Sequence, residues 1–265
     1  MNPSLRHVVV TGAGSGIGLA CALRFLAKGW AVTFNVFDDS NEKTAREEIA
    51  ALTATLRDAA AHALVLRGDV ADDAQCRAMA QQAREHFGRI DALVNAAGIT
   101  RFCDEDDLEG ISAADFHAIY AVNTIGTFQM ARACAEALRS SASSGATSAV
   151  VNLSSYAGIH GGGSSLAYGA SKAAVNAVTL SLARVLAPEV RVNAICPALV
   201  AEGFVARLQP ESFVQRAARQ VERTPLKRVG KPDEIAETVF WLVVGAPLMT
   251  GEIIQLDAGL HLTAR

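Results

Sequence analysis

The chain has 265 residues, 51% of them hydrophobic, and its 24 Lys and Arg residues against 27 Asp and Glu residues give a net charge of -3. A chain of this length and composition can bury a large core, and we expect one globular domain over residues 1–265. The basic residues are dispersed, which argues against nucleic-acid binding, and no stretch approaches the roughly 18 apolar residues of a membrane span.

The five cysteines are odd in number and widely spaced, without a Cys-x-x-Cys pair. This is typical of a reducing compartment rather than of a disulfide framework or a zinc site. None of the six histidines has another His or Cys at a ligand spacing, so we expect no metal centre. The first residues also lack the pattern of a signal peptide, and we therefore expect a cytoplasmic protein without a membrane partner.

In the first half of the chain, short β-branched apolar runs alternate with segments of helical period. The expected strands are HVVVT, AVTFNV, ALVLRGD and DALVNAAG, and the expected helices cover 16–28, 42–60 and 72–87. This alternation is typical of βαβ units, whose parallel strands are buried on both faces.

The second half continues the pattern. A helix over 113–139, the strand SAVVNLS, a helix over 167–186, the strand VRVNAIC and a last strand near EIIQLD are expected. The polar stretch 140–148 is predicted to be a surface loop, and 201–223, which has helical period, is predicted to be a lid over a substrate. The fold class is therefore α/β: a single-domain Rossmann fold with a doubly wound parallel sheet of about seven strands and helices on both faces.

A glycine-rich turn, Thr11-Gly12-Ala13-Gly14-Ser15-Gly16-Ile17-Gly18, follows the first expected strand directly and precedes a helix. Glycine permits positive φ and a close approach of the backbone to a pyrophosphate, and the helix N-terminus offers free N–H groups to an anion. A tight strand-to-helix turn without a ligand has the same composition, but the strand before and the helix after favour a nucleotide site.

Tyr168 and Lys172 are four residues apart in a predicted helix, so both side chains project from one face. A nearby ammonium favours the phenolate, and we expect it to lower the pKa of Tyr168 from its ordinary value of about 10. Tyr168 can then act as an acid in reduction and as a base in oxidation. Ser155 follows a strand at the edge where open parallel sheets bind ligands, and its hydroxyl can hold a substrate oxygen.

The block TGAGSGIG resembles the cofactor loop of the short-chain dehydrogenase/reductase family. Other blocks agree in the expected order: Gly68-Asp69-Val70, Asn95-Ala96-Ala97-Gly98, Asn123, Ser155 and Tyr168-Gly169-Ala170-Ser171-Lys172. The resemblance covers essentially the whole chain, and AGITR is similar to ketoacyl-carrier-protein reductases. It implies an NAD(P)-dependent oxidoreductase that interconverts a ketone and a secondary alcohol by hydride transfer.

The family also implies roles for particular residues. The catalytic set would be Asn123, Ser155, Tyr168 and Lys172, with Asn123 supporting a water that links Lys172 to solvent, and the offset from Tyr168 selects Ser155 over Ser154. Asp69 and Val70 would face the adenine. The residues implied to hold the dinucleotide are Gly12, Ser15, Gly16, Ile17, Gly18, Asp38, Asp69, Val70, Asn95, Ala96, Gly98, Tyr168, Lys172, Pro197 and Val200. A homotetramer or a homodimer is expected from the resemblance.

Several positions depart from the family pattern. Val36 stands where many NAD-using relatives have Asp, and the acids Asp38 and Asp39 come only two residues later. With no basic partner for a 2′-phosphate, electrostatics favour NAD, but the sequence leaves NAD or NADP open. Ala198 replaces a common Gly, and Glu202 replaces a Thr, so that Glu202 either accepts a hydrogen bond from the nicotinamide carboxamide or points to solvent.

The substrate side is less defined. The expected pocket residues are Ile99, Arg101, Phe102, Ile159, His160 and Phe204. An acidic cluster, 104–107 with Glu109, lies near the expected mouth and should repel an acidic carrier protein, which favours a small diffusible substrate. Two other functions are compatible with the fold: a non-catalytic dinucleotide-binding regulatory protein, which has no use for an intact catalytic set, and a lyase or dehydratase, for which the sequence offers no additional acid–base pair.

Overall fold

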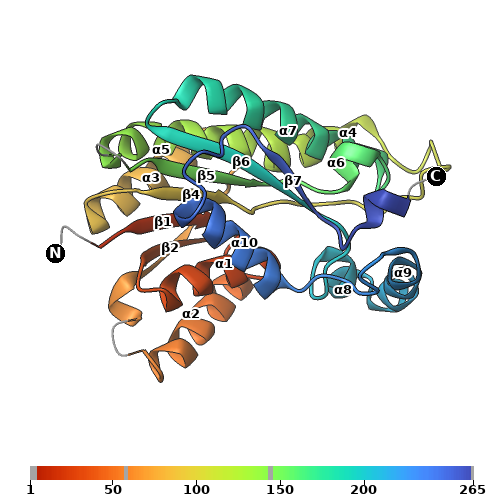
Figure 1. Ribbon diagram of the computed structural model, residues 1–265, viewed down its shortest axis with the longest axis horizontal. Coiled ribbons are helices and arrows are strands. Elements are labelled where there is room, and N and C mark those ends of the chain that lie inside the picture. Colours follow the sequence, from red (N-terminus) through yellow and green to blue (C-terminus); the bar gives the residue numbers. More distant parts are fainter. Residues whose placement is uncertain (1–4, 57–58, 143–145, 264–265) are drawn as a thin grey trace.

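One parallel sheet runs through the protein (Figure 1). The computed structural model describes residues 5–56, 59–142 and 146–263. Its strands are β1 (His7–Thr11), β2 (Ala31–Val36), β3 (Ala63–Arg67), β4 (Ala92–Asn95), β5 (Ser148–Leu153), β6 (Val190–Pro197) and β7 (Ile253–Leu256). Their order is β3-β2-β1-β4-β5-β6-β7, and every neighbouring pair is parallel. The predicted doubly wound sheet of seven strands is confirmed.

Helices cover both faces of this sheet (Figure 1). One face carries α1 (Gly16–Ala27), α2 (Asp39–Thr53) and α10 (Pro232–Val244), and the other carries α3 (Asp73–Phe87), α5 (Thr127–Ser141) and α7 (Leu166–Leu186). The shorter α4 (Ala113–Tyr120) packs against α7. Beyond the carboxyl ends of the strands lie α6 (Ala157–His160), α8 (Phe204–Leu208) and α9 (Pro210–Arg223). Short 3-10 turns cover Ala60–His62 and Leu260–Thr263.

Two hydrophobic cores lie on opposite sides of the sheet, because successive strand side chains point to opposite faces. On β1, Val8 and Val10 pack in the core that includes Phe25 of α1. Val9 packs in the other core, with Leu138 of α5. Burial on both faces explains why the strands are continuous apolar runs rather than alternating ones.

Two predicted helices have different bounds in the structure. The helix expected over 42–60 is α2, which starts earlier because the Asp38 side chain accepts a hydrogen bond from the Asn41 N–H at 2.8 Å and caps it. The continuous helix expected over 113–139 is divided into α4 and α5 by a π-helical turn, Ala121–Gly126, which contains Asn123. Such turns inside α-helices are frequent at functional sites. The loop predicted at 140–148 lies partly outside the described residues, and α10 was not among the predicted elements.

The order of the strands reverses direction between β1 and β4, which lie next to each other. The connections after these two strands therefore run to opposite sides and leave a crevice at their carboxyl ends. Within the described residues, no helix combines the length and the apolar character needed to cross a membrane.

Arg191 of β6 is the buried cation that joins the sheet to α10. It is 6% exposed, and its guanidinium donates to the carbonyls of Leu242 (2.8 Å), Val243 (2.8 Å) and Ala246 (2.9 Å) at the end of that helix. We predict that Arg191→Met lowers the free energy of unfolding by about 3 kcal/mol, because three helix-end carbonyls lose a charged donor. Urea denaturation measures this, and the exposed Arg184→Met on α7 should change stability by less than about 0.5 kcal/mol. If Arg191→Met lowered the free energy of unfolding no more than Arg184→Met does, the hydrogen bonds of Arg191 would contribute little to stability.

Candidate active site

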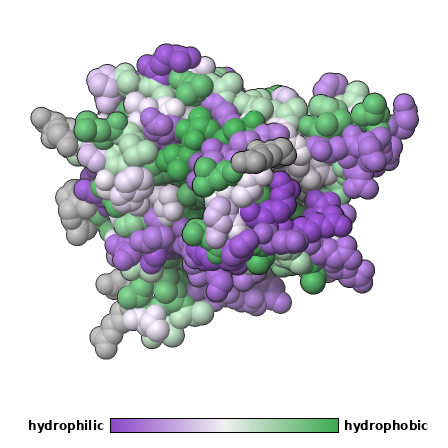
Figure 2. All heavy atoms as spheres, turned by 45° about the vertical axis from the view of Figure 1, so that its right-hand side comes forward, coloured by the Kyte–Doolittle hydropathy of each residue, from purple (hydrophilic) through white to green (hydrophobic). Residues whose placement is uncertain are grey.

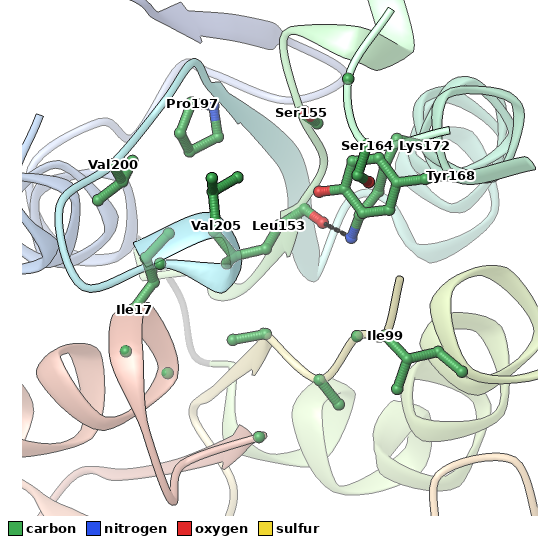
Figure 3. A pocket seen from close by; sticks show the side chains of 18 of the residues that line it. Ile17, Ile99, Leu153, Ser155, Ser164, Tyr168, Lys172, Pro197, Val200 and Val205 are labelled. Atoms are coloured by element: carbon green, nitrogen blue, oxygen red, sulfur yellow. Dashed lines mark hydrogen bonds between the residues drawn. The ribbon is translucent and has the colours of Figure 1, made fainter. Parts of the chain in front are cut away.

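A cavity of about 1020 Å³ opens at the carboxyl ends of the strands. Loops after β1 to β6 line it, together with α8 and α9. Figure 3 shows Ser155, Tyr168 and Lys172 on one side of this space and Ile17, Pro197 and Val200 on the other. The cavity is large enough for an elongated ligand in contact with both groups.

The glycine turn after β1 is shaped by close packing. A Cβ on Gly12 would lie 2.7 Å from the Ala97 Cα, and one on Gly18 would lie 2.2 Å from the Gly12 carbonyl oxygen. Gly16 differs, since its φ is +55° and a Cβ there would approach only the Glu202 carbonyl oxygen, at 3.5 Å. Gly16 therefore leaves room in the cavity directly beside the N-terminus of α1, whose first N–H groups have no partner within the helix. This cradle fits the pyrophosphate of a dinucleotide.

Most residues predicted to hold a dinucleotide do line the cavity. They are Gly12, Ser15, Gly16, Ile17, Gly18, Asp38, Asp69, Val70, Ala96, Gly98, Tyr168, Lys172, Pro197 and Val200. The sequence reasoning missed Asn35, Phe37 and Asn41, which line the same end as Asp38 and Asp69. Their position at the carboxyl end of β2 and the start of α2 could have predicted this, because the carboxyl ends of neighbouring parallel strands lie at one edge of the sheet.

Ser155, Tyr168 and Lys172 come together as predicted. The Lys172 Nζ lies 5.8 Å from the centre of the Tyr168 ring and donates to the Leu153 carbonyl oxygen at 2.7 Å (Figure 3). The Ser155 hydroxyl is hydrogen-bonded to the Tyr168 phenol. The neighbouring Ser154 is buried and donates to the Lys172 carbonyl oxygen at 3.0 Å. Ser155 rather than Ser154 thus meets the phenol.

The expected lowering of the phenol pKa was wrong for this structure. Burial raises the pKa of Tyr168 to about 12, although the hydrogen bond with Ser155 opposes the change. Burial also lowers the pKa of Lys172 to about 8, since its side chain is removed from water. Sequence spacing indicated that the two groups are neighbours, but desolvation penalises the charged form of both.

Asn123 is fully buried and does not line the cavity. Its side chain accepts from the Ile99 N–H at 2.8 Å and donates to the Ile99 carbonyl (3.0 Å) and to the Ser171 hydroxyl (3.0 Å). Ile99 lines the cavity, and Ser171 lies between Tyr168 and Lys172 on α7. The side chain of Asn123 therefore joins the cavity wall to α7, and its catalytic role through a water stays a prediction.

Asn95 is the one predicted cofactor residue that does not line the cavity. It is 3% exposed, and its amide donates to the Asn152 side chain at 2.9 Å and to the Thr127 carbonyl at 3.3 Å. The amide of Asn95 therefore links β4 to β5 and α5, while its buried Oδ1 has no hydrogen-bond partner among the described residues, and a contact of Asn95 with the cofactor stays a prediction.

Several predicted pocket residues also lie elsewhere. Ile99 lines the cavity, but Arg101 pairs with Asp115 at 3.4 Å, and the His160 Nε2 lies 2.6 Å from Gln255. Phe102 and Ile159 are likewise absent from the lining, Glu202 is exposed outside it, and the side chain of Phe204 lies outside what the structure describes. Of the two alternatives for Glu202, the structure has the one in which it faces solvent. These loop residues were assigned from sequence proximity, which does not fix the direction of a loop side chain.

Other lining residues had no role in the sequence reasoning. Buried Ser164, hydrogen-bonded to Thr100, lines the wall near Tyr168. From the predicted lid, the structure brings in Arg207 of α8 and Arg216, Arg219 and Arg223 of α9. The spacing of the α9 arginines indicated one helical face, but not that this face meets the cavity.

Comparisons with known proteins agree with this geometry. A family model described as enoyl-(acyl carrier protein) reductase matches residues 12–261. A protein of Streptomyces violaceoruber named ketoacyl reductase 2 of the granaticin polyketide synthase is 37% identical over 98% of both chains. A solved short-chain dehydrogenase/reductase from Burkholderia xenovorans is 44% identical, with a TM-score of 0.88 over 98% of this chain and 100% of that one. The structure of levodione reductase is 30% identical, with a TM-score of 0.87 over 98% of each chain.

The chain therefore belongs to the short-chain dehydrogenase/reductase family and is an enzyme of the oxidoreductase class. This family generally uses NAD or NADP.

We predict a pH-dependent stability effect of the buried lysine. Because the pKa of Lys172 is about 8 when folded and 10.5 when exposed, the unfolded chain binds more protons between these values, and the stability of the native protein rises with pH there. Lys172→Met removes this dependence. We compare the free energy of unfolding of the variant with that of the parent by urea denaturation at both pH values. The difference, variant minus parent, should be about 2 kcal/mol more positive near neutral pH than near pH 9.5. If the difference between variant and parent were the same at both pH values, the Lys172 ammonium would not be desolvated.

Proposed function

We propose that the enzyme interconverts a ketone and a secondary alcohol with NAD(P). The observation that carries this proposal is the cluster of Ser155, Tyr168 and Lys172 on the wall of a cavity that also reaches the N-terminus of α1. The cavity thus offers a place for a dinucleotide pyrophosphate and a proton donor within one space. A proton donor without a hydride site, or the reverse, would not support this chemistry.

The bound nicotinamide supplies the hydride in reduction and accepts it in oxidation. Ser155 donates a hydrogen bond to the substrate oxygen and holds it beside the phenol. In reduction, the carbonyl carbon gains the hydride and its oxygen takes the proton of Tyr168, which leaves a phenolate; in oxidation each step reverses. A phenol with a pKa of about 12 keeps its proton until negative charge develops on that oxygen, and the Lys172 ammonium then stabilises the phenolate.

The names of the relatives support a ketone substrate. A ketoacyl reductase and a levodione reductase both reduce ketones, and they resemble this chain over almost their whole length. The substrate is proposed to be a small diffusible molecule, α8 and α9 to form its lid, and the enzyme to be a homotetramer or a homodimer.

The proposal predicts that the purified protein oxidises NADH or NADPH in the presence of a panel of ketones, followed by nicotinamide absorbance. Tyr168→Phe should lower kcat by about 10²–10⁴-fold, because the proton donor is lost while the ring is kept. Dinucleotide affinity, measured by calorimetry, should stay within about twofold, since the phenol hydroxyl is not a pyrophosphate ligand. Tyr120→Phe, on α4 outside the cavity lining, is the matched control.

An active Tyr168→Phe variant would remove that residue from its role. Absence of turnover across the panel with the dinucleotide still bound would instead favour a non-catalytic dinucleotide-binding protein.

The adenosine end of the cavity predicts a preference for NAD(H). Asn35, Phe37, Asp38 and Asn41 line it after β2, with Asp69 after β3, and no described residue of this group is a cation. The nearby Arg67 is hydrogen-bonded to Asp39 and to the Phe37 carbonyl. A 2′-phosphate would meet Asp38 without a counter-charge, so kcat/KM should be about tenfold higher or more with NADH than with NADPH. Asp38→Ser should narrow this ratio; equal use of both dinucleotides by the parent enzyme would contradict the prediction.

A further inference from the structure

Three arginines of α9 face the cavity. Arg216, Arg219 and Arg223 follow each other at intervals of three and four residues, so they share one side of the helix, and all three line the cavity. Figure 2 shows hydrophilic side chains gathered at the lower middle and right of the molecule, on the side where Figure 1 places α8 and α9. The cavity thus has a cationic wall that the overall charge of -3 does not suggest.

These arginines have no carboxylate partner among the residues that the structure describes. Arginines elsewhere on the described surface are often paired, for example Arg46 with Glu42 and Arg77 with Asp73. Among the described residues that line the cavity, the only acids are Asp38 and Asp69, which follow β2 and β3 at the proposed adenosine end. The positive charge of α9 is therefore not neutralised within the cavity.

Arg216 lies on the substrate side, next to the catalytic phenol. It is half-buried, and its guanidinium donates to the Gly163 carbonyl oxygen at 3.4 Å. Gly163 packs on Tyr168, since a Cβ there would lie 3.4 Å from the Tyr168 Cδ1. The Ser212 hydroxyl, 3.1 Å from the Arg216 Nε, helps to hold the side chain. Arg223 lies near Tyr156, which follows the catalytic Ser155, and its charge partly opposes the burial that raises the pKa of Tyr156.

We infer that the substrate carries an anionic oxygen group, a carboxylate or a phosphate, which the α9 arginines bind while its ketone or alcohol meets Ser155 and Tyr168. Planar guanidinium groups recognise such oxyanions through paired charged hydrogen bonds. Arg216 is half-buried, whereas Arg219 and Arg223 are exposed at the mouth of the cavity. The N-terminus of α1, where the pyrophosphate is proposed to bind, lies across the cavity from Tyr168, whereas Arg216 donates to Gly163 beside Tyr168 (Figure 3). The ketone or alcohol of the substrate rests on the proposed function, whereas its anionic group is inferred from the α9 arginines alone.

The test uses levulinate and its longer straight-chain homologues, each compared with its methyl ester, in the presence of NADH. Where the chain length fits, kcat/KM for the acid should exceed that for the ester by about tenfold or more, since the ester has the same ketone without the charge. Arg216→Gln should lower kcat/KM for the acid by about tenfold more than kcat/KM for the ester, and so remove most of that preference, because only the acid loses a charged partner. Arg46→Gln, an exposed arginine of α2, should keep the preference. A matching set of oxoalkyl phosphates decides between the two oxyanions.

Esters that react as well as the acids and the phosphates would overturn the inference and leave the proposed function intact. Equal losses for acid and ester in Arg216→Gln, together with weaker NADH binding, would overturn it as well, because the arginine would then serve the cofactor. Calorimetry of the same acids and phosphates with the NADH-loaded protein gives a reading without turnover. Binding that Arg216→Gln abolishes supports the inference even if no ketone reacts, whereas no binding by any anion contradicts it.

Discussion

The burial of one ammonium beside one phenol is the constraint on which the site depends. Lys172 is 4% exposed, and its ammonium donates a hydrogen bond to the Leu153 carbonyl oxygen, with no carboxylate paired to it among the described residues. Burial disfavours the charged form of both groups. The Lys172 ammonium therefore loses its proton more readily than in water, and the Tyr168 phenol keeps its proton more firmly. A phenolate formed during reaction would find a cation already in place, at no cost of reorganisation.

The surrounding fold holds this pair rigidly. Ser154 at the end of β5 donates to the Lys172 carbonyl, and α6 approaches so closely that a Cβ on Gly158 would lie 2.6 Å from the Lys172 carbonyl carbon. Asn123, placed by the π-helical turn between α4 and α5, bonds Ser171 on the same helix. These contacts fix α7 against β5 from several directions, so that Tyr168 and Lys172 are held in place relative to the cavity.

The two halves of the chain contribute different residues to the cavity. The first half provides the glycine turn, the N-terminus of α1 and the acidic residues Asp38 and Asp69. The second half provides Ser155, Tyr168 and Lys172, and α8 and α9 line the remaining side. β4, between β1 and β5, joins the halves. The resulting cavity is acidic at one end and basic along the α9 wall, an asymmetry that net charge conceals because most surface charges lie elsewhere.

Sequence alone determined the sheet, the glycine turn, the proximity of Tyr168 to Lys172 and many of the residues that line the cavity, since strand and helix periods fix which residues share a face or an edge. It did not determine the sign of the Tyr168 pKa shift, the buried role of Asn95, the break at Asn123 or the destination of Arg101 and His160. Nor did it show that the arginines of α9 turn toward the cavity. Those outcomes depend on how elements distant in the chain pack together, because desolvation and side-chain direction are set by neighbours that only the folded structure supplies.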